Sequence, residues 1–303
     1  MVTNLQTPIF FMGVIELLDS IFLQTLINGL LLGALYALIA MGLTLIFGVM
    51  RIINLAHGEF TILGAYATYW TCVILGVNPM LSLVVSVPLG ALLGLIVYFA
   101  LTRRIVYAPE LTSLLVFFGL SMILQNIMLL LWKADIRGLP TTYPSIVLGG
   151  ITIIGDRLIA AITALIVSLI LLLFLKYSYL GRAIRAVVQD FEAAPLVGIN
   201  VHVIYALSMC IGLALTSAGG SLLALTTPFT PYVSGVYTLY SFLVVVLGGL
   251  GNPIGSLLGG LIVGVAISFT ATYWLAGISP TVAFVLLVLI LLFKPEGIFS
   301  RRR

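Results

Sequence analysis

The sequence has 303 residues, of which 62% are hydrophobic and 7% are charged, and its formal net charge is +4. Soluble domains carry about 25% charged residues, so this chain has too little polar material to cover a surface in water. Apolar runs of about 20 residues, the length that crosses a bilayer as a helix, fill most of the sequence. These numbers exclude a soluble domain and predict an all-α, polytopic transmembrane bundle that forms a single domain over residues 1–303.

Nine apolar segments can be drawn along the chain, and we predict eight or nine crossings. They cover residues 21–50, 60–77, 80–101, 112–132, 158–175, 203–225, 237–250, 254–276 and 281–293. The first is longer than one crossing requires, and it can break at Gly42 or Gly48. No basic residue precedes Arg51, so the first segment lacks the charged leader of a cleaved signal peptide and is expected to stay as a membrane helix.

Basic residues predict the orientation, because Lys and Arg concentrate in short cytoplasmic loops. With an external amino terminus and nine spans, the cytoplasmic side holds Arg51, Arg103, Arg104, Lys176, Arg182, Arg185, Lys294, Arg301, Arg302 and Arg303. The outer side holds Lys133, Arg137 and Arg157. We therefore predict that the amino terminus, with Glu16 and Asp19, lies outside and that the carboxy terminus is cytoplasmic. The positive net charge then indicates topology and not a nucleic-acid partner.

The cytoplasmic loop at 176–202 is the most polar stretch of the chain. Gly181 can end the helix before it. Apolar residues then recur at helical spacing, and these are Ala183, Ile184, Val187 and Val188. Polar residues fall elsewhere on the helix, and these are Arg182, Arg185, Gln189 and Glu192. The pattern predicts a short amphipathic helix outside the bilayer, closed by Pro195; from the residues alone, a helix resting on lipid headgroups is as well supported as a docking surface.

A polar elbow follows the first span and consists of Arg51, Asn54, His57, Gly58 and Glu59. The i, i+3, i+6 spacing of Arg51, Asn54 and His57 places them near one helical face. An unpaired charge at the centre of a membrane helix costs about 2.5–3.5 kcal/mol, so the elbow is wet or its charges are paired. One alternative is a structural network in which Arg51 pairs with Glu59 while Asn54 and His57 cap helix ends. The other is a gate in a translocation path.

Polar residues inside the spans can contact a neutral or zwitterionic solute or bond to another helix. They are Asn28, Tyr36, Thr44, Ser121, Gln125, Asn126, Thr216 and Ser217. The four-residue spacing of Gly251, Gly255 and Gly259 is typical of closely packed helices, and the Asn252–Pro253 pair predicts a hinge or a turn. Cys72 and Cys210 lie in apolar runs without metal-ligand spacing, so we predict packing roles and no metal site.

Three stretches of the sequence resemble one known family. They are NLAHGEF at 54–60 followed by LGAY at 63–66, GRAIRAVVQDFEAAPLVGINV at 181–201, and VVLGGLGNPIGSLLGG at 245–260. In this order, over almost the entire chain, they resemble the branched-chain amino-acid ABC permease family. Length near 300 residues, without an added amino-terminal region, is similar to the shorter of the two permeases that such systems usually pair.

The cytoplasmic loop carries a second resemblance. Glu192, Ala193 and Ala194, followed by Gly198, look like the EAA motif of ABC importer permeases, whose loop docks as a coupling helix on the ATP-hydrolysing subunit. The chain departs from that pattern downstream, where Ser208 and Cys210 replace the expected isoleucine and leucine. The residues that the resemblance assigns to coupling are Gly181, Arg182, Arg185, Asp190, Glu192, Ala193, Ala194 and Gly198.

The resemblance implies a permease subunit of an ATP-driven importer for branched-chain or similar neutral amino acids, in the plasma (inner) membrane of a prokaryote. The implied partners are a second homologous permease in a heterodimer, two cytoplasmic ATP-binding subunits, an external or periplasmic solute-binding protein and the lipid bilayer. No cofactor is expected on this chain, and ATP with Mg²⁺ is expected on the partner subunits.

The lysines support the need for a separate ATPase. A phosphate-binding loop requires glycine before its lysine, whereas the three lysines here follow Trp132, Leu175 and Phe293. We therefore predict a transport subunit and not an enzyme. Two alternatives remain: a permease for urea or short amides in the same family, and an ion-coupled secondary carrier. The carrier would need an ionisable residue in mid-span, whereas the predicted topology places every Asp and Glu in a loop or at a span end.

Overall fold

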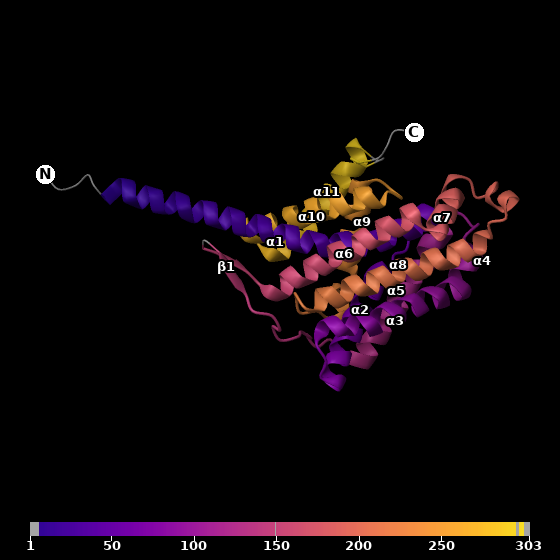
Figure 1. The fold of residues 1–303 in the computed structure, drawn as a ribbon, viewed down its shortest axis with the longest axis horizontal. Helices are drawn as coiled ribbons and strands as arrows, with labels where there is room; N and C mark the ends of the chain where they lie inside the picture. Colours follow the sequence, from indigo (N-terminus) through magenta and orange to yellow (C-terminus); the bar gives the residue numbers. More distant parts are fainter. Residues whose placement is uncertain (1–5, 149, 295–296, 300–303) are drawn as a thin grey trace.

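The computed structural model describes residues 6–148, 150–294 and 297–299, with side chains from residue 20 onward. Most of its helices lie lengthwise in one bundle (Figure 1). The α-helices are α1 (Gln6–Met50), α2 (His57–Leu75), α3 (Leu83–Val97), α4 (Arg103–Ile105), α5 (Glu110–Trp132), α6 (Gly155–Tyr177), α7 (Tyr179–Gln189), α8 (Val201–Ala224), α9 (Ser234–Gly248), α10 (Pro253–Tyr273) and α11 (Ser279–Phe293). Eight helical stretches of the described chain are long and apolar enough to cross a membrane, which confirms the predicted polytopic helical bundle.

Short elements connect the helices. The 3-10 segments are η1 (Pro79–Ser82), η3 (Ala194–Val197), η4 (Pro231–Val233) and η5 (Ala276–Ile278), and a π-helical segment, η2 (Tyr98–Thr102), joins α3 to α4. The strands β1 (Ile146–Leu148) and β2 (Ile151–Ile153) pair antiparallel, with Val147 opposite Thr152. The hairpin lies at one end of the bundle, and α4 and α7 lie at the other (Figure 1). We call these the hairpin end and the α7 end.

Helix α1 is continuous to Met50, so the predicted break at Gly42 or Gly48 is wrong. Both glycines instead allow another backbone to come close. A Cβ on Gly42 would overlap the carbonyl oxygen of Gly212 in α8, and a Cβ on Gly48 would lie 3.0 Å from the Cα of Gly251. Neither contact requires the helix to end.

The loop at the hairpin end is tied down by two polar side chains. The carboxylate of Asp156 accepts hydrogen bonds from the backbone N–H groups of Thr142 (3.1 Å) and Tyr143 (2.9 Å). The amide of Gln24 in α1 donates to the Thr152 carbonyl and accepts from the Thr152 N–H, both at 2.8 Å. Because Gln24 bonds both polar groups of one β2 residue, it holds the hairpin against α1.

Helices α3 and α10 carry the same S-x-x-x-G-x-x-x-G pattern. Its residues are Ser86, Gly90 and Gly94 in α3, and Ser256, Gly260 and Gly264 in α10. In α3 they meet Ser221, Ala214 and Cys210 of α8, whereas in α10 they meet Thr44, Ala37 and Gly33 of α1. The partners are spaced by seven and then four residues in both helices. The α3–α8 and α10–α1 interfaces are therefore equivalent.

Helices α1 and α8 also make equivalent contacts with each other where they cross. A Cβ on Gly42 would overlap the space of Thr216, and one on Gly219 would overlap the space of Ile39. Helix α2 packs on α8 as α9 packs on α1. Since α1 and α8 run in opposite directions, the chain consists of two inverted repeats, α1–α3 and α8–α10, that cross where α1 meets α8.

The second helix of each repeat begins inside the bundle. Residues 51–56 lead back from the α7 end, and α2 starts at His57, whose Nε2 lies 2.9 Å from the carbonyl oxygen of Ile39, eleven residues before the end of α1. Helix α9 starts at Ser234, whose carbonyl group fills the space beside Gly58. Helices α2 and α9 therefore start next to each other and run toward opposite ends.

Candidate transport and coupling sites

The polar elbow lies largely in the bundle interior. Asn54, His57 and Glu59 are buried, whereas Arg51 is exposed at the end of α1 with a φ of +54°. Residues 51–56 are not helical, so the prediction that Arg51, Asn54 and His57 share a helical face is wrong. The predicted pairing of Arg51 with Glu59 is also wrong, because the fold-back carries Glu59 away from Arg51; among the described residues, one ion pair is found, between Arg137 and Asp135 (3.0 Å).

His57 lies between the two repeats. Its Nε2 is 2.9 Å from the Ile39 carbonyl oxygen and 3.1 Å from the Thr216 hydroxyl. Ile39 and Thr216 occupy equivalent places in the α1–α8 crossing, so His57 bonds to both repeats at the point where they meet. Asn54 supports the turn before it, because its Oδ1 accepts a hydrogen bond from the backbone N–H of Ala56 at 3.0 Å. His57 therefore joins helices and does not cap one.

Glu59 occupies the junction of α2, α5 and α9. Its side chain is 2% exposed, and Oε1 accepts a hydrogen bond from the Ser121 hydroxyl of α5 at 2.7 Å. The Ser234 hydroxyl is near the same carboxylate, but it donates to the Pro231 carbonyl at 2.9 Å, which leaves Oε2 without a donor. The prediction that every acidic residue lies in a loop or at a span end is wrong for Glu59, because α2 starts in the bundle interior.

Gly58 makes this junction possible. Its N–H donates to the Thr238 hydroxyl of α9 at 2.9 Å, and a Cβ at this position would overlap the Ser234 carbonyl. A larger residue would separate the starts of α2 and α9, so the junction needs glycine here.

Helix α5 covers Glu59 with few neighbours of its own. Its main contacts are with α2 and η4. Gln125 is half-buried one turn beyond Ser121, and Asn126 is exposed, with its amide donating to the Met122 carbonyl of the same helix at 2.8 Å. Nearby on α9, Gly235 is exposed and has open space where a Cβ would stand. The junction therefore lies beneath a helix whose exposed side chains are mostly apolar and which carries two amide groups.

The other polar candidates within spans are occupied by contacts between helices. Thr44 bonds to Ser256 at 2.6 Å, and Ser217 donates to the Ser86 carbonyl at 2.8 Å. The ring of Tyr36 packs against that of Tyr240, with 5.1 Å between ring centroids. Together with Thr216, these groups connect α1 and α8 to their neighbours, and they do not form one site with Gln125 and Asn126.

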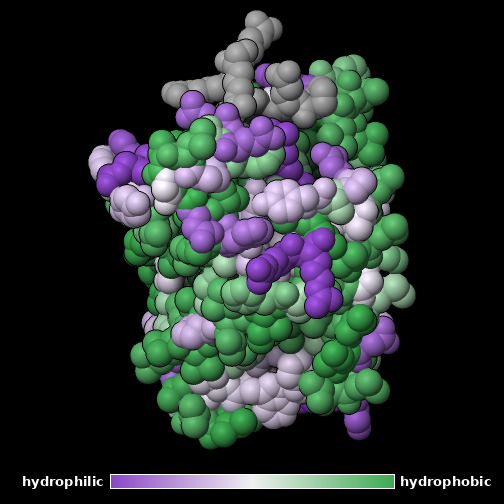
Figure 2. Space-filling model, turned by 90° about the vertical axis from the view of Figure 1, so that its right-hand side faces the viewer, coloured by the Kyte–Doolittle hydropathy of each residue, from purple (hydrophilic) through white to green (hydrophobic). Residues whose placement is uncertain are grey.

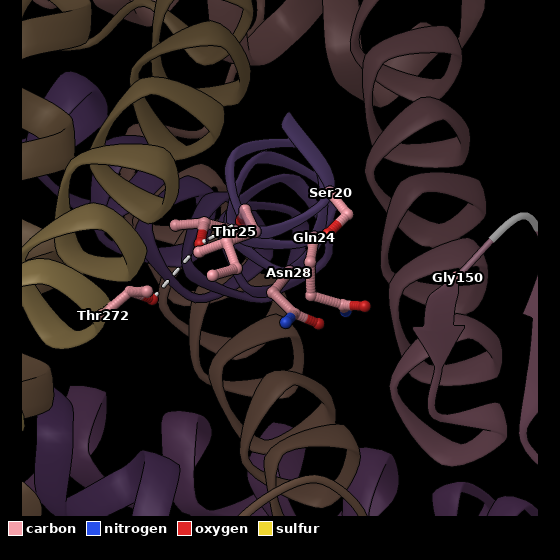
Figure 3. A pocket seen from close by; sticks show the side chains of 7 residues that line it. Ser20, Gln24, Thr25, Asn28, Gly150 and Thr272 are labelled. Carbon is pink, nitrogen blue, oxygen red and sulfur yellow. Dashed lines mark hydrogen bonds between the residues drawn. The ribbon is translucent and has the colours of Figure 1, made fainter. Parts of the chain in front are cut away.

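Asn28 belongs to a separate pocket at the hairpin end. A cavity of about 200 Å³ is lined there by Ser20, Ile21, Gln24, Thr25, Asn28, Gly150 and Thr272. Figure 3 shows Gln24 and Asn28 extending from α1 into the space between α10, which carries Thr272, and the hairpin, which carries Gly150. Thr25 donates a hydrogen bond to Thr272 at 3.4 Å. Apart from Asn28, sequence reasoning missed this pocket, because its walls come from distant segments.

At the α7 end, Gly181 does not end a helix as predicted. Helix α6 ends at Tyr177, and the Ser178 hydroxyl accepts a hydrogen bond from the Gly181 N–H at 2.8 Å to cap α7. A Cβ on Gly181 would lie 2.5 Å from the Leu175 carbonyl oxygen, so this glycine brings α7 onto the end of α6.

Arg182 and Arg185 bind the free carbonyl groups at the end of α6. Arg182 donates to the carbonyl of Tyr177 at 3.1 Å, and Arg185 donates to that of Lys176 at 3.3 Å. Cations are favourable at a helix carboxyl terminus because its exposed carbonyl groups carry partial negative charge. The two arginines thus hold α7 against α6.

The apolar face of α7 packs on the bundle as the spacing indicates. Ala183, Ile184 and Val187 are buried. The helix ends at Gln189 and not at Pro195, because the Asp190 carboxylate accepts hydrogen bonds from the N–H groups of Glu192 and Ala193, each at 2.9 Å, and turns the chain. Pro195 lies in the first turn of η3.

Residues 191–198 project from the α7 end, and we call them the loop protrusion. Leu196 and Val197 are 87% and 75% exposed, and Phe191 is also exposed, whereas Ala194 is buried beneath them. Gly198 closes the protrusion with a φ of +82°. Figure 2 looks at the α7 end, where hydrophilic residues gather over much of the surface. Exposed apolar side chains at a polar end of a protein mark a contact surface, and sequence reasoning did not single out Leu196 and Val197.

Three glycines near the α7 end bring backbones together. Gly251 is in a left-handed turn, with φ +77°, before α10, so it does not share a helical face with Gly255 and Gly259 as their spacing predicts. A Cβ on Gly255 would overlap the Gly248 carbonyl, and one on Gly259 would lie 2.9 Å from the Val244 carbonyl oxygen. Helix α10 starts at Pro253, so the Asn252–Pro253 pair forms a turn.

Comparison with known proteins identifies the family of this chain. The family model described as "Branched-chain amino acid transport system / permease component" matches residues 25–293. The chain is 33% identical to the high-affinity branched-chain amino acid transport system permease protein LivH of Salmonella typhimurium over 300 residues, which cover 92% of this chain and 96% of LivH. It is 34% identical to BraD of Pseudomonas aeruginosa, with the same coverage.

A more distant relative comes from an archaeon. The probable LivH permease of Methanocaldococcus jannaschii is 27% identical over 87% of this chain and 88% of its own length. No solved structure matches the chain. The match to the family model and the relatives at one-third identity lead to the same assignment. This multi-pass membrane protein belongs to the family of permease components of branched-chain amino acid transport systems.

Proposed function

We propose that this chain is the transmembrane permease subunit of an ATP-driven importer for branched-chain or similar neutral amino acids. The relatives named as branched-chain amino acid permeases support the substrate class. The loop protrusion is the observation that supports coupling to a separate ATPase, because Leu196 and Val197 are exposed there beside a helix, α7, whose apolar face is packed on the bundle. ATP and Mg²⁺ bind to two partner subunits, and no cofactor binds to this chain.

In this proposal the α7 end is cytoplasmic and the hairpin end is external. Arg103, Arg104, Arg182 and Arg185 are all exposed at or beside the α7 end, which agrees with the excess of basic residues in cytoplasmic loops. Arg301, Arg302 and Arg303, which also entered the prediction, lie outside the described residues. The chain lies in the inner membrane of a prokaryote, and an external solute-binding protein delivers the amino acid to the hairpin end.

The core beneath α7 gives a route for the motion. Ile184 and Val187 of α7 belong to the same buried cluster as Val49 of α1 and Ile204 of α8. Movement of the loop protrusion by the ATPase therefore acts on the end of α1 and the beginning of α8, one helix of each repeat. The two repeats, paired with those of a second homologous permease, then open the path alternately to each side.

The test places two charges on the loop protrusion. Leu196→Asp with Val197→Asp should abolish co-purification of the ATPase subunits and lower ATP-dependent leucine uptake more than tenfold, because carboxylates resist burial in an apolar contact. Deletion of α7 would be less informative, since its buried face belongs to the core.

A matched control is Val147→Asp with Leu148→Asp, two exposed apolar residues of β1 at the opposite end of the bundle. This variant should keep the ATPase subunits bound. Both variants should unfold in detergent at the wild-type temperature. Retention of the ATPase subunits by the doubly charged loop protrusion would contradict the proposed coupling.

A further inference from the structure

The carboxylate of Glu59 accepts one hydrogen bond between helices, through Oε1, and its other oxygen is unpaired. It is buried in the interior of a membrane bundle, where an ionised side chain is expensive. No basic side chain among the described residues pairs with it. Intramembrane ionisable residues of this kind mark the paths of ions or substrates.

Some of the surroundings of Glu59 offset part of the cost of burying its charge. It lies in the first turn of α2 and near Ser234 in the first turn of α9. The amino termini of helices carry partial positive charge, and Ser121 donates a hydrogen bond to Oε1. These contacts reduce the cost of an anion here, and in the described part of the chain no basic side chain pairs with Oε2.

The junction also lies where transporters with inverted repeats bind their substrates. Such sites are found near the bilayer midplane at the interface of the repeats, at the ends of discontinuous helices. Glu59 meets two of these conditions, since α2 and α9 both start beside it and the repeats cross at the neighbouring His57.

Because Glu59 is buried beneath α5, access of a solute to it requires displacement of this helix. This helix is held mainly by α2 and η4, and it bonds to Glu59 through Ser121, which is itself half-buried. Gln125, one turn further along α5, is half-buried and adds an amide group to a helix whose exposed side chains are mostly apolar.

We propose that Glu59 binds the ammonium group of the transported amino acid through Oε2 and that Ser121 positions the carboxylate. The inference rests on the proposed function and makes its substrate class more specific. A zwitterionic amino acid carries the cation that Glu59 lacks, whereas urea and neutral amides carry none.

The test uses the complete transporter, with its ATPase subunits and binding protein, in proteoliposomes. The quantity measured is the number of leucine molecules taken up per ATP hydrolysed, so that solute recognition is separated from motor activity. Glu59→Gln keeps the shape and a hydrogen-bonding group but removes the charge, and it should lower this ratio at least tenfold, while ATP hydrolysis stimulated by the loaded binding protein stays within twofold of wild type.

Two further variants make the result decisive. Glu110→Gln, at the exposed start of α5, is the matched control and should leave the ratio unchanged. Glu59→Asp keeps the charge but withdraws it by one methylene group, so it should lower the ratio about threefold; it decides the question if Glu59→Gln does not assemble. An unchanged ratio in Glu59→Gln, or in Glu59→Asp if the glutamine variant does not assemble, would overturn the proposal. Absence of leucine uptake by the wild-type transporter would instead contradict the proposed function itself.

Discussion

At the scale of single residues, the interior of this membrane protein is held by hydroxyl, imidazole and carboxylate groups at a few crossing points. Thr216 bonds to His57, Ser217 bonds to the α3 backbone, and Ser121 bonds to Glu59. Hydrogen bonds between membrane helices contribute about 0.6 kcal/mol on average. Their value here is positional, because each one fixes how two helices meet.

His57→Ala should destabilise the bundle by about 2 kcal/mol, since it leaves a cavity where a large buried side chain stood and removes hydrogen bonds between the repeats. The thermal unfolding temperature of the purified protein in detergent measures the loss. His202→Ala is the control, because the ring of His202 is exposed, and its effect should be less than half as large. Equal effects of the two changes would show that His57 does not join the repeats.

At the scale of elements, glycine decides where helices touch. The equivalent glycines Gly94 and Gly264 face the backbones of Cys210 and Gly33, respectively, with no room for a side chain. Gly119 of α5, in contrast, has nothing within 4 Å of where a Cβ would stand. Glycine is therefore required for close packing at Gly264 in α10, whereas at Gly119 in α5 a side chain can be accommodated.

Gly264→Ala and Gly94→Ala should each destabilise the fold by about 1–3 kcal/mol, the usual cost of overpacking, and by similar amounts, because the two contacts are related by the repeat. Gly119→Ala should be neutral or should stabilise the protein by up to about 1 kcal/mol, the helix-propensity gain of alanine. Unfolding temperatures in detergent test all three. A large loss for Gly264→Ala with none for Gly94→Ala would contradict the equivalence of the two interfaces.

The sequence predicted the elements that depend on local patterns. The span drawn at 112–132 is observed as α5 (Glu110–Trp132), because an apolar run and its polar flanks are visible in the sequence itself. The amphipathic face of α7 was visible for the same reason. Ser121 was recognised as a polar residue within a span, but its bond to Glu59 was not predicted, since that contact joins residues 62 positions apart.

The internal starts of α2 and α9 were not predicted, because no local signal shows how far residues 51–56 and 225–233 enter the bundle. The inverted repeat is visible in the sequence only as serine and glycine at equal spacing in α3 and α10. Its recognition required the partner residues in α8 and α1, which the fold alone brings into contact.

At the scale of the whole molecule, the two ends have different surfaces. The hairpin end carries a small polar pocket beside the exposed apolar strand β1, and the α7 end carries the loop protrusion and the arginines that hold α7. The proposed orientation assigns the first end to the solute-binding protein and the second to the ATPase subunits.

Cysteine labelling in whole cells tests this orientation. In a chain whose Cys72 and Cys210 are replaced by alanine, Leu148→Cys should react with a membrane-impermeant maleimide added outside the cells. Leu196→Cys should react only after the membrane is permeabilised. Both positions are exposed, so access depends on the side of the membrane. Labelling of position 196 in intact cells would reverse the assignment of the two ends.

The inverted repeat implies a second conformation of the bundle, different from the one in this structure. Residues 51–56 and 225–233 lead into the equivalent helices α2 and α9 but differ in length. Threading α1–α3 onto the path of α8–α10, and the reverse, therefore predicts an alternative conformer in which the two repeats exchange their conformations. That conformer gives coordinates for a second stage of the transport cycle against which distance measurements between spin labels can be compared.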